Sequence, residues 1–186
     1  DAHEVRYRHQ RLSYVVTGSL SLTIACVALV VWLWRRSEQV YLWMGVMQTF
    51  WTLYLAVVLS LDPWPGLGNH TMLLLNVLFF MLYAHCFLVF VFRYTGQHWP
   101  KVEWTAWGLL AIWVMSLLWG RAVSPWQAQM SLVWGVAVFN CGCLYAMYRG
   151  LRTRKPQQLL LGAVCAVMLV VALHDIVVAL RYWDND

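Results

Sequence analysis

The sequence of 186 residues contains little charge: only 11% of its residues are Asp, Glu, Lys or Arg, and 62% are hydrophobic. Ordinary soluble domains have about 25% charged and roughly 45–50% apolar residues. This shortage of charge excludes a soluble globular protein. The formal charge of +5 does not indicate a nucleic-acid partner, because the basic residues are scattered between long apolar runs. The composition therefore predicts an integral membrane protein.

The sequence also lacks the motifs of the common catalytic and cofactor sites. It has no H-E-x-x-H string for a zinc hydrolase and no glycine-rich phosphate loop. Two carboxylates that share a proton need two acids at membrane depth, but Asp175 is the only acid inside an apolar run. His85 and His174 are offset by roughly 13 Å along their expected helices, which argues against a haem held by both. We therefore expect no enzymatic activity, no cofactor and no metal in this segment.

Cysteine and proline are few, and their positions are informative. The five cysteines lie inside apolar runs, where thiols usually behave as small buried hydrophobes, so we expect no disulfide framework. All five prolines fall between these runs or at their edges, where a helix begins or ends.

Nothing near Asp1 has the pattern of a signal peptide. We expect the sequence to be a segment of a longer protein.

Six apolar stretches are long enough to cross a bilayer as helices, which takes roughly 20 residues. They are too long and too uniformly apolar for the alternating strands of a membrane barrel. The predicted fold class is an all-α, polytopic transmembrane helix bundle with six visible spans. The fourth span is the least secure, because Glu103 lies in its first turn. The predicted organisation is a juxtamembrane tail at 1–12, a bundle at 13–181 with spans at 13–34, 40–61, 71–92, 102–120, 127–148 and 157–180, and an outer loop at 182–186.

The Lys and Arg residues of the loops predict the orientation. If the spans alternate, eight basic residues lie on one side, against five on the other when the amino-terminal tail is counted. The positive-inside rule places the side with eight in the cytoplasm, so both ends of the segment face outward. Four of these eight basic residues form one basic loop. We interpret this loop as a topology signal, and the alternative is that it binds anionic lipid. This basic loop consists of Arg149, Arg152, Arg154 and Lys155.

Several polar residues fall at membrane depth, and counting residues along the spans predicts that they form two layers. The outer layer is Asn76, His174 and Asp175, and the inner layer is Gln48, His85 and Asn140. An ionisable group inside a membrane is a functional hypothesis by default, so the outer layer is the candidate switch or ligand layer. For both layers the alternative is hydrogen bonding between helices that only holds the bundle together.

Small residues repeat every four positions on three spans and predict close contacts between helices, because small side chains let two backbones approach. These repeats are Thr17, Ser21 and Ala25 on the first span, Gly142, Ala146 and Gly150 on the fifth, and Gly162 and Ala166 on the sixth.

Two stretches of the chain carry a family resemblance. The first is Trp34-Arg35-Arg36, followed by Ser37-Glu38-Gln39-Val40-Tyr41-Leu42, and the second is Leu173-His174-Asp175, followed by Arg181-Tyr182-Trp183-Asp184-Asn185-Asp186. In this order they resemble the membrane domain of the bacterial seven-transmembrane receptors with diverse intracellular signalling modules. The resemblance implies an extracytoplasmic module before the bundle. It also implies a cytoplasmic output after a seventh span, such as the histidine kinase of a two-component system or a diguanylate cyclase.

The function expected from this resemblance is signal transduction across the bacterial cytoplasmic (inner) membrane, with no enzymatic activity in the segment itself. The expected partners are the lipid bilayer, the protein's own outer and inner modules and a second copy in a homodimer, with no nucleic acid. A small transporter or proton-coupled carrier that uses Asp175 is the alternative. A structural reading, in which the bundle only anchors and dimerises the protein, is the third hypothesis.

Overall fold

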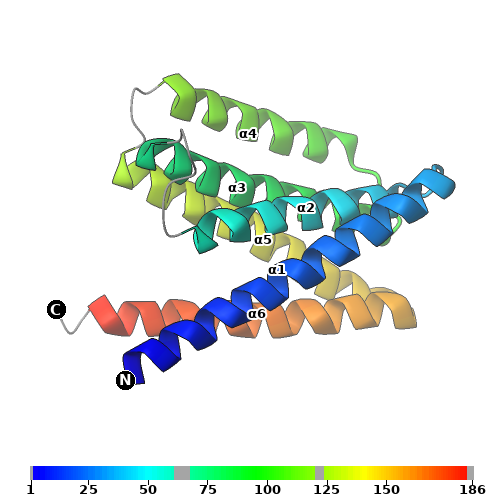
Figure 1. The fold of residues 1–186 in the computed structure, drawn as a ribbon. Coiled ribbons are helices and arrows are strands. Elements are labelled where there is room, and N and C mark those ends of the chain that lie inside the picture. The colour runs from blue at the N-terminus through cyan, green and yellow to red at the C-terminus, as the bar shows by residue number, and fades with distance from the viewer. Residues whose placement is uncertain (1, 61–67, 120–123, 184–186) are drawn as a thin grey trace.

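Six α-helices form the structure, a computed structural model that describes residues 2–60, 68–119 and 124–183 (Figure 1). Side chains are described for residues 12–60, 68–119, 124 and 126–171. Within these ranges there is no β-strand, so the predicted all-α bundle is confirmed. The helices are α1 (Ala2–Trp34), α2 (Gln39–Leu59), α3 (Asn69–Tyr94), α4 (Pro100–Trp119), α5 (Pro125–Thr153) and α6 (Pro156–Trp183).

Five of the helices are long and apolar enough to cross a membrane over their described residues. They are Leu12–Trp34 within α1, all of α2, α3 and α4, and Trp126–Thr153 within α5. The sixth, α6, is apolar over Pro156–Val171, where its side chains are described. Large apolar side chains such as Ile112 and Leu151 are about 70% exposed on the outside of the bundle. Such a surface fits a lipid environment, because in water these large apolar side chains would be exposed to solvent.

The helices α1 and α5 extend well beyond the predicted spans, and α6 continues to Trp183, two residues into the predicted outer loop at 182–186. The tail expected at residues 1–12 is helical from Ala2, so α1 begins eleven residues before the predicted span. Residues 2–12 contain neither Gly nor Pro, and nothing in them stops a helix that leaves the hydrocarbon. The helix α5 continues five residues past the predicted end of the fifth span, to Thr153. It ends where Arg154 adopts a left-handed conformation with φ of 53°. Pro156 then begins α6, as expected for a residue that lacks a backbone N–H.

The helix α3 lies at the centre of the bundle. It packs against α2 on one side and α5 on the other, with a smaller contact to α4 (Figure 1). The terminal helices lie further out, because α1 packs principally on α2 and α6 principally on α5. Among the described side chains of α4, only Leu110 and Leu117 are buried, so α4 is the least embedded of the middle helices. The core is therefore built around one helix.

The contact between α5 and α6 depends on glycine. A Cβ atom at Gly150 would lie 2.7 Å from the backbone oxygen of Gln158, and one at Gly162 would lie 3.3 Å from the Cα atom of Met147. Ala146, one turn before Gly150, is 1% exposed. These three members of the predicted repeats lie at a helix contact, as expected. Gly142 instead faces α3, where an added Cβ would lie 2.9 Å from the ring of Phe87.

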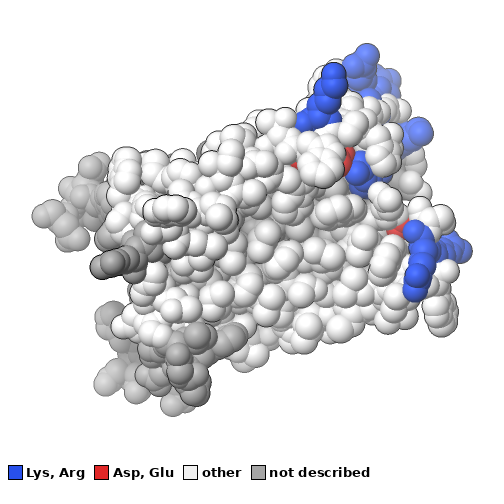
Figure 2. All heavy atoms as spheres, turned by 90° about the horizontal axis from the view of Figure 1, so that it is seen from above, with Lys and Arg blue, Asp and Glu red and all other residues white. Residues whose placement is uncertain are grey.

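All eight basic residues with described side chains lie at one end of the bundle, as Figure 2 shows. At this end α1, α3 and α5 finish, and α2, α4 and α6 begin (Figure 1). The first residues of α1 and the last residues of α6 lie together at the opposite end (Figure 1). The eight residues are Arg35, Arg36, Arg93, Lys101, Arg149, Arg152, Arg154 and Lys155.

The substitution Gly150→Ala is expected to lower the unfolding temperature in detergent, because the new methyl group meets backbone that cannot rotate away. Overpacking of this kind costs about 1–3 kcal/mol, and each kcal/mol lowers the midpoint by roughly 2–4 °C in a chain of this size. The control is Gly108→Ala on α4, where an added Cβ has no neighbour within 4 Å. The control should unfold at or above the wild-type temperature. Equal midpoints for the two variants would contradict the close approach of α5 and α6.

Candidate functional site

A cavity of about 590 Å³ lies between α1, α2, α3, α5 and α6, and we call it the central cavity. Gln48 lies nine residues after the start of α2, and Tyr83 lies eleven residues before the end of α3. At 1.5 Å per residue these positions are about 14 Å and 16 Å from the basic end, close to the middle of a hydrocarbon layer about 30 Å thick. The described lining consists of Thr17, Ser21, Gln48, Trp51, Phe80, Tyr83, Val136, Phe139, Asn140, Val167, Met168 and Val171.

Two of the helices that line the central cavity are the terminal ones, α1 and α6. Val167 and Val171 of α6 line it although they are 64% and 54% exposed. Thr17 of α1 also lines it and is exposed. The interface between α1 and α6 is not among the principal contacts of the described bundle. Over their described residues, the two terminal helices thus contact the central cavity more than they contact each other.

The predicted inner layer is divided between two sites. Gln48 and Asn140 line the central cavity, as depth alone predicts. His85 instead lies by a groove of about 380 Å³ between α4 and α5, which Lys101, Thr105 and Trp134 also line. Its side chain is 1% exposed, and its ring centre is 6.0 Å from that of Trp107 on α4. Equal depth therefore does not bring His85 together with the two carboxamides.

The hydrogen bonding of His85 fixes how its ring is oriented. Nδ1 lies 2.8 Å from the carbonyl oxygen of Met81, one turn earlier on α3, so Nδ1 donates the proton. Nε2 is buried and has no hydrogen-bond partner. The hydrogen bond therefore uses Nδ1, and Nε2 is left without a partner beside the groove.

Only one residue of the predicted outer layer has a described side chain. Asn76 lies seven residues after the start of α3, and its Oδ1 atom is buried with no hydrogen-bond partner. His174 and Asp175 belong to helix α6, but their side chains lie outside the described residues. Because α3 packs principally on α2 and α5, α6 is not among its main neighbours. The contact between Asn76 and either α6 residue stays a prediction.

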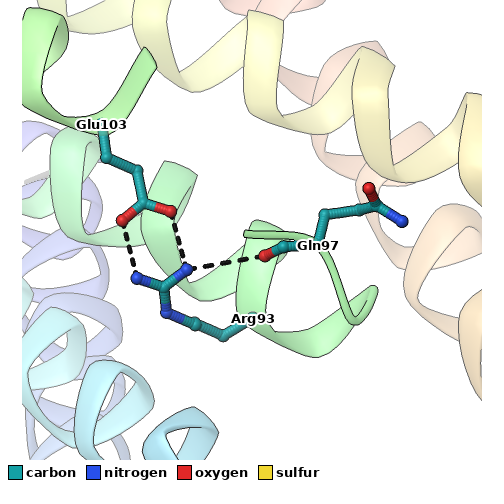
Figure 3. A network of polar contacts seen from close by, with 3 residues as sticks. All are labelled: Arg93, Gln97 and Glu103. Carbon is teal, nitrogen blue, oxygen red and sulfur yellow. Dashed lines mark hydrogen bonds and ion pairs between the residues drawn. The ribbon is translucent and has the colours of Figure 1, made fainter. Parts of the chain in front are cut away.

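The basic end contains an ion pair that the sequence did not suggest. Arg93, at the end of α3, donates from Nη1 to Oε1 of Glu103 at 2.7 Å and from Nη2 to Oε2 at 2.6 Å (Figure 3). Nη1 also lies 3.5 Å from the carbonyl oxygen of Gln97 in the connecting turn. Both charged side chains are nearly buried, at 12% and 13% exposure. Glu103, which weakened the prediction of the fourth span, is the residue that ties α4 to α3.

The basic loop at the end of α5 is largely built into the fold. Arg149 donates from Nη2 to the carbonyl oxygen of Thr95 at 3.5 Å, which links α5 to the end of α3. Arg152 donates to the Tyr148 hydroxyl at 2.7 Å. Arg154 caps α5 in its left-handed conformation, while Lys155 is exposed. Two of the four cations are thus engaged by the protein itself, and the remaining charge faces the aqueous interface.

Three hydroxyl-bearing residues of the central cavity were missed by sequence reasoning. Thr17 and Ser21 of α1 were assigned only to a packing repeat, and Tyr83 of α3 was not singled out. The available signal was helical register, because Ser21 follows Thr17 by one turn on the same face of α1. No comparable signal existed for Tyr83, since it lies in a helix that is apolar on all sides.

The described side chains contain no cluster of three or more His, Cys, Asp or Glu residues that could hold a metal ion. Searches against protein-family models, curated proteins and solved structures find no match for the chain. What the protein does is therefore inferred from the geometry of its own cavity and helices.

The variant Glu103→Gln tests the ion pair between α3 and α4. The amide keeps the size of the side chain but leaves Arg93 nearly buried without its counter-charge, which costs about 3 kcal/mol. Chemical unfolding in detergent micelles measures this loss. The matched control is Glu38→Gln, which removes the exposed ion pair of Arg35 with Glu38 and should change stability by about 0.5 kcal/mol or less. A similar small change for both variants would show that the Arg93 pair does not hold α4.

Proposed function

We propose that this chain is the transmembrane signal-transducing domain of a bacterial receptor. The observation that carries the proposal is the construction of the central cavity. Its walls come partly from the central helices α2, α3 and α5, and partly from α1 and α6, each of which packs principally on a single neighbour. A change in cavity occupancy and a displacement of α1 or α6 are therefore linked.

This linkage is sufficient for a receptor mechanism. If the bundle has two packings that differ in the position of α1 or α6, a ligand that fits one packing better shifts the population toward it. The coupling is reciprocal, so a force on either terminal helix also changes the affinity of the central cavity. α3, packed on three helices, provides the fixed frame against which the terminal helices move.

The orientation follows from the basic end. Eight described basic residues at one end of an apolar bundle favour that end in the cytoplasm under the positive-inside rule. The start of α1 and the end of α6 then lie at the outer face of the cytoplasmic membrane. The resemblance to the bacterial seven-transmembrane receptors supports a further span after α6 that carries the chain to a cytoplasmic output module. It also supports an extracytoplasmic module joined to α1.

The structure offers less support for a carrier. Transporter sites at mid-membrane are typically formed by helices that unwind there, whose free backbone groups bind the substrate or the coupling ion. The five helices that line the central cavity run through its level as unbroken α-helix. The described lining therefore presents side chains alone, which suits a binding site that changes packing better than a translocation path.

The orientation is tested by labelling intact cells with a maleimide that does not cross membranes. A cysteine at exposed Asn69, where α3 begins at the outer end, is expected to react in intact cells. A cysteine at exposed Lys155 is expected to react only after the cells are permeabilised. The five native cysteines lie within the helices and are replaced by Ala in both variants and in the unlabelled control. The reverse labelling pattern would place the basic end outside and remove the proposed orientation.

The receptor function is tested by the output of the intact protein that carries this chain. Asn140→Leu and Gln48→Leu alter the cavity lining and so change the balance between the two packings. A coupling of 1–3 kcal/mol corresponds to about 5–150-fold, so we expect at least a fivefold change in basal output or response at equal expression. Gln129→Leu is the control, because this exposed carboxamide on α5 is not among the described lining residues. Unchanged output in both cavity variants would contradict the receptor function.

The carrier alternative is tested with the purified chain in liposomes. Under an imposed pH gradient, we expect proton flux equal to that of empty liposomes. Proton-linked uptake of a solute that is abolished by Asp175→Asn would support the carrier and overturn the receptor proposal.

A further inference from the structure

The polar side chains of the central cavity have unused hydrogen-bonding capacity. No hydrogen bond joins the Ser21 hydroxyl, the Tyr83 hydroxyl or the carboxamides of Gln48 and Asn140 to another described group. These four side chains come from four different helices and converge on one space. The central cavity is therefore a mainly apolar space with a few polar side chains that have no hydrogen-bond partner in the described protein.

Most serine and threonine hydroxyls of α1 and α2 do not behave in this way. Thr17, Ser19 and Thr23 of α1 each donate to a carbonyl oxygen three or four residues earlier, at 2.8–2.9 Å. On α2, Thr49 and Thr52 do the same at 2.9 Å. Bonds within the helix are the usual way for a hydroxyl to be satisfied at membrane depth, where hydrocarbon offers no partner. Ser21, which lies between bonded neighbours, departs from this pattern where α1 lines the central cavity.

Asn140 has a polar atom without a partner. Its Oδ1 atom is buried and makes no hydrogen bond to a described group. A buried polar atom without a hydrogen-bond partner is destabilising, so the carboxamide gains from turning this atom toward a donor in the central cavity.

The remaining lining defines the chemical class of the ligand. Trp51, Phe80, Tyr83 and Phe139 form a continuous aromatic wall, in which the rings of Trp51, Phe139 and Phe80 have centres 4.9, 5.8 and 6.4 Å from that of Tyr83. The described part of α6 contributes only apolar side chains, and none of the described lining residues is charged. The volume of about 590 Å³ falls in the range of roughly 300–1,000 Å³ that is typical of small-molecule sites.

We propose that the central cavity binds an uncharged, flat, lipophilic molecule that carries a hydroxyl or amide group. The aromatic wall contacts the flat body of the ligand, and the carboxamides of Asn140 and Gln48 bind its polar group. A hydroxyl group suits a carboxamide, because it can donate a hydrogen bond to the carboxamide oxygen and accept one from the carboxamide N–H. This inference names the ligand class for the site on which the proposed function rests.

The test compares two probes of nearly equal size, 2-naphthol and 2-methylnaphthalene, which differ in one hydroxyl group. Radiolabelled probe is equilibrated with the intact protein in lipid nanodiscs, and binding to empty nanodiscs is subtracted. We expect saturable binding of 2-naphthol about tenfold tighter than that of 2-methylnaphthalene, as one or two net hydrogen bonds would give. Equal affinity for the two probes would overturn the role of the carboxamides. The absence of saturable binding by either probe would show that water or protein fills the central cavity, and would overturn the site.

Substitutions in the cavity lining test which side chains cause the preference for 2-naphthol over 2-methylnaphthalene. Asn140→Leu and Gln48→Leu are each expected to reduce the preference for 2-naphthol several-fold while 2-methylnaphthalene still binds, which also shows that the variants are folded. Gln129→Leu, outside the described lining, should keep the tenfold preference. A preference that survives both cavity substitutions would overturn the proposal.

The ligand site and the receptor function can fail separately. If the wild-type protein prefers 2-naphthol and the cavity variants lose that preference, but the output of those variants is unchanged, the receptor function is removed and the site remains. Altered output in those variants without any probe binding would keep the receptor function and remove the ligand class.

Discussion

Hydrocarbon offers no hydrogen-bond partner, and the architecture of this bundle follows from that constraint. Backbone groups are satisfied within long α-helices, and most helical hydroxyls donate to a carbonyl of their own helix, as Thr23 and Thr52 do. Where a side chain makes a bond to another helix, the geometry is short and specific, as in the indole N–H of Trp113 on α4, which donates to Ser131 of α5 at 2.8 Å. Against this background, a group of polar side chains without partners is the exception that indicates a site.

Cohesion in lipid cannot come from the hydrophobic effect between helices, because the lipid tails are as apolar as the side chains. The bundle relies instead on close packing. Gly150 and Gly162 let α5 and α6 approach until backbone meets backbone, and Gly45 accommodates Leu29 and the carbonyl oxygen of Ala25 where α1 crosses α2. α4 has little of this packing and is fixed to α3 by the bidentate pair of Arg93 and Glu103. The terminal helices α1 and α6 are thus each attached principally at one interface, while α3 is attached at three.

This unequal attachment gives the central cavity its importance. Two of the helices that line it, α1 and α6, each pack principally on a single neighbour, and under the proposed function they are also the helices whose outer ends would connect to other parts of a receptor. A movement of either helix would therefore involve one principal interface, that of α1 with α2 or that of α6 with α5. The eight described basic residues lie at the other end of the bundle, away from the start of α1 and the end of α6.

The sequence by itself determined that the protein is a membrane helix bundle, where each helix lies to within a few residues apart from the longer α1 and α5, and which end carries the described basic residues. Those properties depend on length, apolar composition and charge, which are read along one dimension. It also determined depth, since 1.5 Å per residue puts Gln48, His85 and Asn140 at similar levels. Only the tertiary structure decided which way these residues face: the two carboxamides line the central cavity, and His85 lies by the groove between α4 and α5. It also brought in Ser21 and Tyr83, and paired Arg93 with Glu103. The physical reason is that rotation of a helix about its own axis is set by packing against its neighbours, and a helix that is apolar on every side carries no one-dimensional record of that rotation.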